Sequence, residues 1–261
     1  MIEDKKVSQL IANTYFQKLE DSLSADVIIV GAGPSGLVAG GYLAKKGLKV
    51  NLIERKGSLG GGIWGGAMMF NEVVIQKDAV HILEECEIRY TQKDSDYVIT
   101  SSPLLASGLS FHACRNGVKV FNFVSAEDVM INKGSVTGVV INWTAVKFAN
   151  LHVDPLAMMS DYVIDGTGHE CQVVNIALEK LRDSSTGKKI IGERSLNADI
   201  GEQECVENSC EVIPGLYVMG MAANAYNGGH RMGPIFGGML LSGEKVAKEI
   251  LEKKKQPAGK K

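Results

Sequence analysis

Residues Ala25–Glu54 read ADVIIV, then GAGPSGLVAGGYLAKKGL, then KVNLIE, and this stretch decides the fold. An apolar run, Val27–Val30, stops at the first glycine of a GxGxxG pattern. A segment of helical character, Leu37–Lys46, follows, and a second apolar run ends at Glu54. This order predicts a strand–turn–helix–strand unit and an α/β fold of the Rossmann-like type found in FAD- and NAD-linked reductases.

The three glycines of the motif have separate tasks in such a unit. Gly31 permits the tight turn, Gly33 lets backbone N–H groups approach a pyrophosphate, and Gly36 allows the helix to pack closely on the strand. Glu54 lies 23 residues after Gly31 (54 − 31), near the ~20 expected for an acid that binds an adenosine ribose. The motif predicts an adenine dinucleotide with a free 2′-hydroxyl, NAD or FAD, against the alternative of an ordinary strand–helix turn.

Length and composition limit the class of protein. The chain has 261 residues, 45% hydrophobic and 22% charged, with a net charge of −2. We expect one nucleotide-binding domain over residues 1–261, no nucleic-acid partner and no membrane association. The uncharged run Val27–Ala44 contains five glycines and Pro34, so the nucleotide motif explains it better than a membrane span does. The polar N-terminus and five scattered cysteines favour a cytoplasmic protein with free thiols.

The N-terminal segment predicts an amphipathic helix over residues 4–20. Its apolar residues recur at helical spacing, and they are Val7, Leu10, Ile11, Tyr15 and Leu19. Such a face must pack against something: the protein core is the default expectation, and a subunit interface is the alternative.

Glycine-rich residues Gly57–Gly66 follow Glu54 and contain Ile63 and Trp64. Because glycines have no side chain, the backbone of this segment can approach a ligand closely. We therefore predict a second ligand-contacting loop, and a flexible linker is the alternative.

Several later segments have recognisable character. We expect helices over Gln76–Glu85 and Met239–Lys253, a helix or turn rich in small residues over Ser102–Cys114, and a disordered basic tail over about residues 254–261. Lys119–Val124, Asp128–Ile131 and Gly138–Trp143 predict a β-meander inserted over about residues 115–145, with a turn at 132–135. Val124 would end its strand and contact adenine through its backbone, or simply belong to the core.

Four later residues are candidates for chemistry. His152, Asp154 and His169 form a His-x-Asp…His set, which suits a non-haem Fe(II) centre with open positions. The alternative is a capping aspartate with two hydrogen-bonded histidines. Arg231 lies among glycines before the last helix, where its guanidinium matches a carboxylate of either a substrate or an internal aspartate.

The motifs GAGPSG with LIER, LGGGIWGGAMMFN, LHVDPL, VIDGTGH, PGLYVMGM and HRMGPIFGGMLLSG together resemble the thiamine thiazole synthases of eukaryotes and archaea. The resemblance covers nearly the whole chain. FAD-dependent reductases share the first motif but not LHVDPL with HRMGPIFGG.

This resemblance implies that NAD is a substrate. NAD loses nicotinamide, and its ADP-ribose is joined to glycine and sulfur to give an ADP-linked thiazole carboxylate. It also implies that Fe(II) is held by Asp154 and His169 of neighbouring chains, that Arg231 holds the glycine carboxylate, and that Glu54 binds the adenosine. Further positions that line the nucleotide in relatives are Ser35, Arg55, Gly62, Val124, Val153 and Met219. The family forms rings of protomers, commonly octamers.

The residue at position 152 differs between two branches of the family that this chain resembles. Eukaryotic members carry a cysteine there and give up its sulfur, whereas this chain has His152, as in the archaeal branch that uses sulfide. An FAD-dependent oxidoreductase is the competing enzyme class, and a non-enzymatic NAD sensor is a third reading that leaves the histidines and Arg231 without a task.

Overall fold

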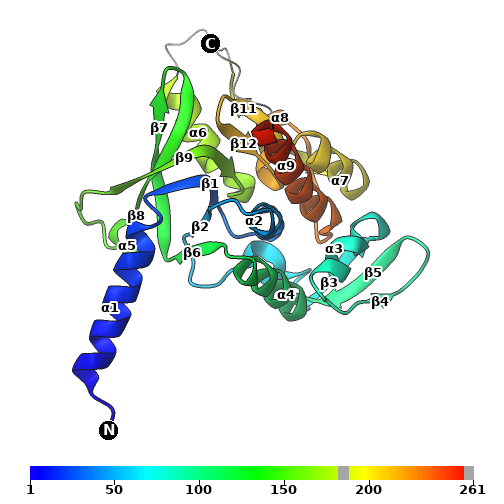
Figure 1. The fold of residues 1–261 in the computed structure, drawn as a ribbon. Coiled ribbons are helices and arrows are strands. Elements are labelled where there is room, and N and C mark those ends of the chain that lie inside the picture. Colours follow the sequence, from blue (N-terminus) through cyan, green and yellow to red (C-terminus); the bar gives the residue numbers. More distant parts are fainter. Residues whose placement is uncertain (182–187, 256–261) are drawn as a thin grey trace.

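The computed structural model describes residues 1–181 and 188–255 (Figure 1). Its centre is a sheet in the order β11-β12-β9-β1-β2-β6. Adjacent strands from β12 to β6 run parallel, and β11 is antiparallel to β12. The bounds of these strands are β1 Ser24–Val30, β2 Val50–Glu54, β6 Lys119–Asn122, β9 Leu156–Asp165, β11 Cys210–Ile213 and β12 Leu216–Val218. The α/β fold predicted from residues 25–54 is confirmed.

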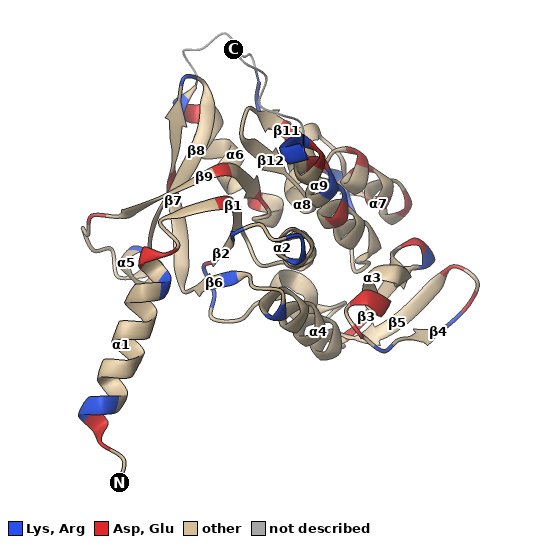
Figure 2. Cartoon of the chain, viewed as in Figure 1, with Lys and Arg blue, Asp and Glu red and all other residues tan. Residues whose placement is uncertain are grey.

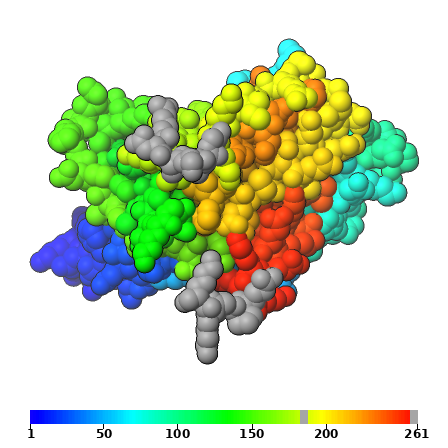
Figure 3. Space-filling model, turned by 90° about the horizontal axis from the view of Figure 1, so that it is seen from above, coloured from blue at the N-terminus to red at the C-terminus, as the bar shows by residue number. Residues whose placement is uncertain are grey.

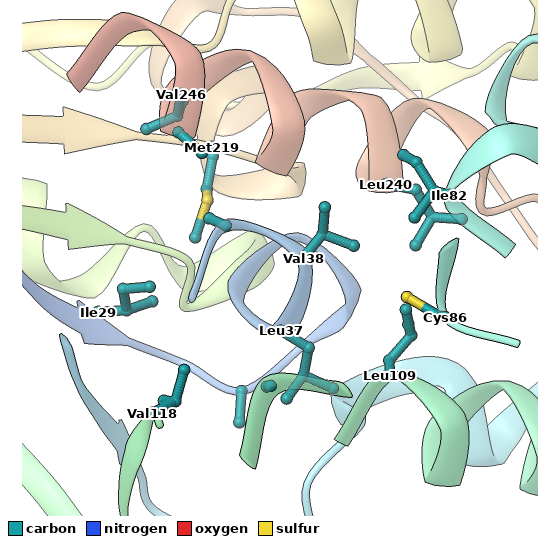
Figure 4. Packing of buried hydrophobic residues seen from close by; sticks show 14 of the residues in the cluster. Ile29, Leu37, Val38, Ile82, Cys86, Leu109, Val118, Met219, Leu240 and Val246 are labelled. Atoms are coloured by element: carbon teal, nitrogen blue, oxygen red, sulfur yellow. The ribbon is translucent and has the colours of Figure 1, made fainter. Parts of the chain in front are cut away.

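Side chains of β1 divide the core into two parts because successive residues of a strand point to opposite faces. Val27 and Ile29 pack on the face covered by α2 (Pro34–Lys45), α4 (Ser102–Arg115) and α9 (Gly237–Lys255). Figure 4 shows this packing around α2, where Leu37 and Val38 lie between Val118, Leu109 and Leu240.

The opposite face of the sheet is covered by α6 (Gln172–Lys180) and by a hairpin of β7 (Val124–Asn132) and β8 (Ser135–Trp143). Ile28 and Val30 of β1 belong to this second core. The hairpin turns at Lys133 and Gly134, both with positive φ, as the sequence predicts.

The predicted meander needs correction, because Lys119–Asn122 is a parallel strand beside β2 and not part of the insertion. Val124 correspondingly begins β7 rather than ending a strand. Local β-propensity could not distinguish a sheet strand from a hairpin strand, since both are rich in β-branched and aromatic residues. β8 pairs in addition with β9.

A second, smaller sheet lies at the edge of the molecule, in the order β3-β5-β4. Its strands are β3 Glu72–Gln76, β4 Thr91–Gln92 and β5 Tyr97–Ser101. The expected helix over Gln76–Glu85 is shorter, since β3 ends at Gln76 and is followed by η2 (Lys77–Ala79) and α3 (Val80–Glu85).

A short helix, α5 (Thr144–Phe148), follows β8, and the C-terminal third supplies three further helices. They are α7 Ala198–Glu207, α8 Met221–Asn227 and α9, and two short strands, β10 Arg194–Leu196 and β13 His230–Arg231, pair in parallel beside them. Figure 2 shows acidic residues on α7 and a mixture of basic and acidic residues on α9. The last predicted helix extends to Lys255, so the predicted tail lies outside the described residues from position 256. In the described part of the chain, none of the helices has the length and apolar character needed to cross a membrane.

Helix α1 (Asp4–Glu20) projects away from the body of the molecule (Figure 1) and reaches one edge of the view in Figure 3. Only its C-terminal part packs on the core, through Tyr15 and Leu19. Ile11 and Phe16 are 67% and 65% exposed, and the helix has no buried residue. The default expectation of core packing is therefore wrong for most of this helix.

Candidate functional site

A cavity of about 720 Å³ lies at the carboxyl ends of β1, β2, β9 and β12, beside the N-terminus of α2. Ligands of open α/β sheets bind at this edge. Ten of the predicted site residues line the cavity: Gly31, Gly33, Ser35, Glu54, Arg55, Gly62, Val124, His169, Met219 and Arg231. Four do not, namely Gly36, His152, Val153 and Asp154.

The motif glycines differ in what surrounds them. A Cβ on Gly31 would lie 2.3 Å from the Gly166 carbonyl oxygen, and one on Gly36 would lie 2.1 Å from the Gly31 carbonyl oxygen. Gly33 has no atom within 4 Å of such a Cβ and lines the cavity. Gly31 and Gly36 therefore serve chain packing, whereas Gly33 keeps the cavity wall open beside the helix N-terminus, where an anion is stabilised.

The second glycine-rich loop lies against the first. The Gly60 amide donates to the Ala32 carbonyl over 2.7 Å, and a Cβ on Gly61 would be 2.9 Å from the Gly33 Cα. Residues 61–65 form a 3-10 turn, η1, and Gly62 faces the cavity with no atom near its missing Cβ. The two loops together form one glycine-lined wall.

Glu54 is buried at the end of β2, and its two oxygens are both engaged. Oε2 accepts the Ala32 amide over 2.9 Å, and Oε1 accepts the Lys56 amide over 2.7 Å. The carboxylate thus joins the glycine turn to the end of β2, and its remaining lone pairs are the acceptors that ribose hydroxyls need.

A buried aspartate shapes the turn that carries His169. Asp165 ends β9, and its Oδ1 accepts the Thr167 amide and hydroxyl over 2.9 and 2.7 Å. Its Oδ2 accepts the Val174 amide over 2.9 Å and so satisfies the first turn of α6. Burial raises the pKa of the Asp165 carboxyl, while these hydrogen bonds oppose the rise.

Two residues of this turn, His169 and Glu170, contact side chains from other parts of the chain. His169 Nδ1 lies 2.7 and 2.8 Å from the two oxygens of Glu193. Arg55 and Glu170 form a two-pronged ion pair of 2.7 and 2.9 Å, which raises the pKa of Arg55 and lowers that of Glu170. Glu170 lines the cavity, and Glu193 lies beside it.

Arg231 belongs to the short strand β13, which pairs with β10 through Leu196. Its side chain is exposed and lines the cavity. Among the described residues no carboxylate forms an ion pair with it. In the described part of the chain, Arg231 therefore has no internal aspartate as its ion-pair partner.

The segment with His152 and Asp154 lies outside the cavity. It has no regular structure, and its apolar neighbours Leu151 and Val153 are exposed. Within the described residues, no group of three His, Cys, Asp or Glu side chains is arranged to hold a metal ion. One chain thus contributes His169 to the cavity but does not bring Asp154 to it.

Sequence reasoning did not identify Asp165, Glu170 or Glu193. Asp165 had a usable signal, because an acid at a strand end before Gly-Thr-Gly is suited to cap the following helix. Glu193 had no such signal in the sequence, since it lies 24 residues from His169.

All five cysteines are free, as expected, and burial raises the pKa of Cys171, which lies near His169 in sequence.

The fold and cavity define an α/β protein of the Rossmann-like type in which acids, a histidine and an arginine share one pocket with two glycine loops. The Thi4 family profile matches residues 8–236. The chain is 50% identical to "Thiamine thiazole synthase" of Pyrococcus furiosus, covering 97% of this chain and 99% of the relative. The same name belongs to relatives from Methanothermobacter thermautotrophicus, 50% identical over 97% and 99%, and Thermotoga maritima, 47% identical over 97% and 98%.

A solved structure agrees with this relationship. The crystal structure of Thermovibrio ammonificans THI4 superposes with a TM-score of 0.94 at 46% identity, covering 98% of this chain and 99% of that one. The chain belongs to the Thi4 family.

Proposed function

We propose that this protein is a thiamine thiazole synthase that converts NAD, glycine and sulfide to an ADP-linked thiazole carboxylate and nicotinamide. The observation that carries the proposal is the meeting of Glu54, His169 and Arg231 in one glycine-walled cavity, in a chain 50% identical to curated thiamine thiazole synthases. About 720 Å³ is within the usual volume of a ligand site.

Each residue has a task that its surroundings support. Glu54 accepts hydrogen bonds from the adenosine ribose, and the N-terminus of α2 with Ser35 and Gly33 faces the diphosphate. Further nucleotide contacts come from Arg55, Gly62, Val124 and Met219, whereas Val153 lies outside the cavity of its own chain. Arg231 holds the glycine carboxylate with its guanidinium fork, so that the amine faces the opened ribose of ADP-ribose.

The proposed metal is Fe(II), held by His169 and by Asp154 of a second copy. The residues fit this use, because His169 lines the cavity with Nδ1 occupied by Glu193, whereas Asp154 lies on an exposed segment of the same chain. When bound, a ferrous ion supplies a Lewis acid with open positions for a soft anion such as sulfide. His152 has no sulfur to donate, so sulfide enters from solution and the protein turns over repeatedly.

A shared site requires an assembly, and we propose a homo-octamer. Two exposed apolar surfaces support association: the outer part of α1, and the segment from Phe148 to Leu156 that carries Asp154. Mixing Asp154→Ala with His169→Ala protein should restore activity that each variant alone lacks, if the two ligands come from different chains. Light scattering should give eight times the 28.0 kDa protomer mass.

The function is tested in an anaerobic assay with NAD, glycine, Fe(II) and sulfide, followed by mass spectrometry of small molecules and of the intact chain. We expect nicotinamide and more than one adenylated thiazole per chain, formation that depends on sulfide, and no loss of sulfur from the protein. Product without sulfide, together with a cysteine converted to dehydroalanine, would contradict the sulfide-dependent mechanism. A purified protein with a flavin spectrum would favour an FAD oxidoreductase instead.

A further inference from the structure

The imidazole of His169 is held by an acid that comes from a different part of the chain. Glu193 places both carboxylate oxygens within 2.8 Å of Nδ1, and its side chain is only 17% exposed. No hydrogen bond joins Nε2 of His169 to another residue in the part of the chain described here. Nδ1–H therefore donates to the acid, and Nε2 is the nitrogen left for a ligand.

The backbone on both sides of Glu193 is anchored to the end of α8. Gly192 donates its amide to the Ala225 carbonyl over 2.9 Å, and Arg194 donates to the Gly229 carbonyl over 2.8 Å. Ile191 donates to the Tyr226 carbonyl over 3.2 Å. The carboxylate is thus presented by a segment bonded to the protein body on either side, which limits how far the imidazole can rotate with it.

We propose that Glu193 is the positioning residue for the metal-binding histidine: it keeps the proton of His169 on Nδ1 and aims Nε2 into the cavity. This inference rests on the proposed role of His169 as an Fe(II) ligand. A metal binds only an unprotonated ring nitrogen, and a carboxylate on the opposite nitrogen both selects that tautomer and fixes the ring plane.

The same segment connects His169 to Arg231. Directly after Glu193 the chain forms β10, and β10 pairs with β13 so that Arg194 lies opposite His230 and Leu196 opposite Arg231. Arg231 therefore lies in one of these paired strands, and His169 contacts the residue directly before the other.

The test measures Fe(II) binding to the intact assembled protein by anaerobic calorimetry, and ADP-ribose binding in the same preparations. Because loss of such an outer carboxylate typically costs 10–100-fold in metal affinity, we expect Glu193→Ala to weaken Fe(II) binding by roughly that factor. Glu193→Gln retains an acceptor oxygen and should recover part of the loss. ADP-ribose affinity should change by less than about twofold, since Glu193 does not line the cavity.

Two controls separate the possible causes. Glu170→Gln removes an equal charge beside His169, but Glu170 bonds to Arg55 and not to the imidazole, so this variant should leave Fe(II) affinity within about threefold. Equal losses in Glu170→Gln and Glu193→Ala would reduce the effect to charge attraction and overturn the proposal. So would unchanged Fe(II) affinity in Glu193→Ala, or a matching loss of ADP-ribose binding. His169→Ala with native Fe(II) affinity would overturn the metal-binding role itself, and the inference with it.

Discussion

Arg55 and Glu170 face each other across the cavity mouth in a fork-to-fork ion pair, Nη1 to Oε2 at 2.7 Å and Nη2 to Oε1 at 2.9 Å. Arg55 follows the end of β2, while Glu170 belongs to η3 (Gly168–Glu170). The pair therefore connects the end of β2 to the turn that carries His169. Both side chains are about half exposed, so the pair contributes little to stability.

Glu170→Gln should strengthen ADP-ribose binding. The guanidinium of Arg55 would lose a carboxylate that competes with the diphosphate, and a gain of roughly two- to five-fold corresponds to an exposed ion pair. The free energy of unfolding should change by less than about 1 kcal/mol. Calorimetry and denaturant titration measure the two quantities, and a weaker complex would mean that Glu170 holds Arg55 in its binding position.

Gly33→Ala and Gly36→Ala should fail in different ways. A Cβ at position 33 meets nothing within 4 Å but enters the cavity, so stability should stay within about 1 kcal/mol while ADP-ribose affinity falls at least about tenfold. A Cβ at position 36 would lie 2.1 Å from the Gly31 carbonyl oxygen, and the overpacking should cost about 3 kcal/mol. Thermal unfolding with and without ADP-ribose distinguishes them. Equal stability losses would refute the separate roles.

Glu54→Gln should reduce both nucleotide affinity and stability. An amide offers one acceptor oxygen, whereas Glu54 accepts the Ala32 and Lys56 amides on different oxygens. One buried N–H would lose its partner, which costs about 1–3 kcal/mol. Glu85→Gln is the matched control, because Glu85 is partly exposed and forms an ion pair with the exposed Lys45 over 3.4 Å. If both variants unfold at the same denaturant concentration, Glu54 has no structural task.

Glu202 should make stability depend on pH. It is buried, and burial raises the pKa of its carboxyl, although its Oε2 accepts from Gln76 and from the Gly238 amide at the start of α9. As pH rises above the ordinary glutamate pKa of about 4.3, the unfolded chain ionises first. Stability from this group is therefore present below that pH and is lost as pH rises toward the folded-state pKa.

Glu202→Gln resembles the protonated acid and keeps the oxygen that accepts both donors. Its unfolding free energy should match the native protein near pH 4 and exceed it at pH 8, by roughly 1.4 kcal/mol for each unit of pKa elevation. Denaturant titrations at several pH values give this difference. A difference that does not vary with pH would show that Glu202 titrates normally.

Local sequence determined the strand–turn–helix–strand unit of residues 25–54. GxGxxG between two apolar runs specifies its strand, turn and helix through interactions within thirty residues, and the structure has β1, α2 and β2 there. Asn132–Ser135 likewise formed the predicted turn, because Lys133 and Gly134 accept positive φ. The spacing of Glu54 from Gly31 likewise predicts its place at the cavity edge, whereas Arg55 and Met219 are assigned there by the family resemblance.

Tertiary structure decided the features that depend on distant residues. Whether Lys119–Asn122 joins β2 or the hairpin is a matter of partner strands, which β-propensity does not encode. Whether an amphipathic helix finds a core depends on where the chain carries it, and α1 is directed outward. The contacts of His169 with Glu193 and of Arg55 with Glu170 join residues 24 and 115 positions apart. Only folding brings such pairs together, since no periodicity of the sequence connects them.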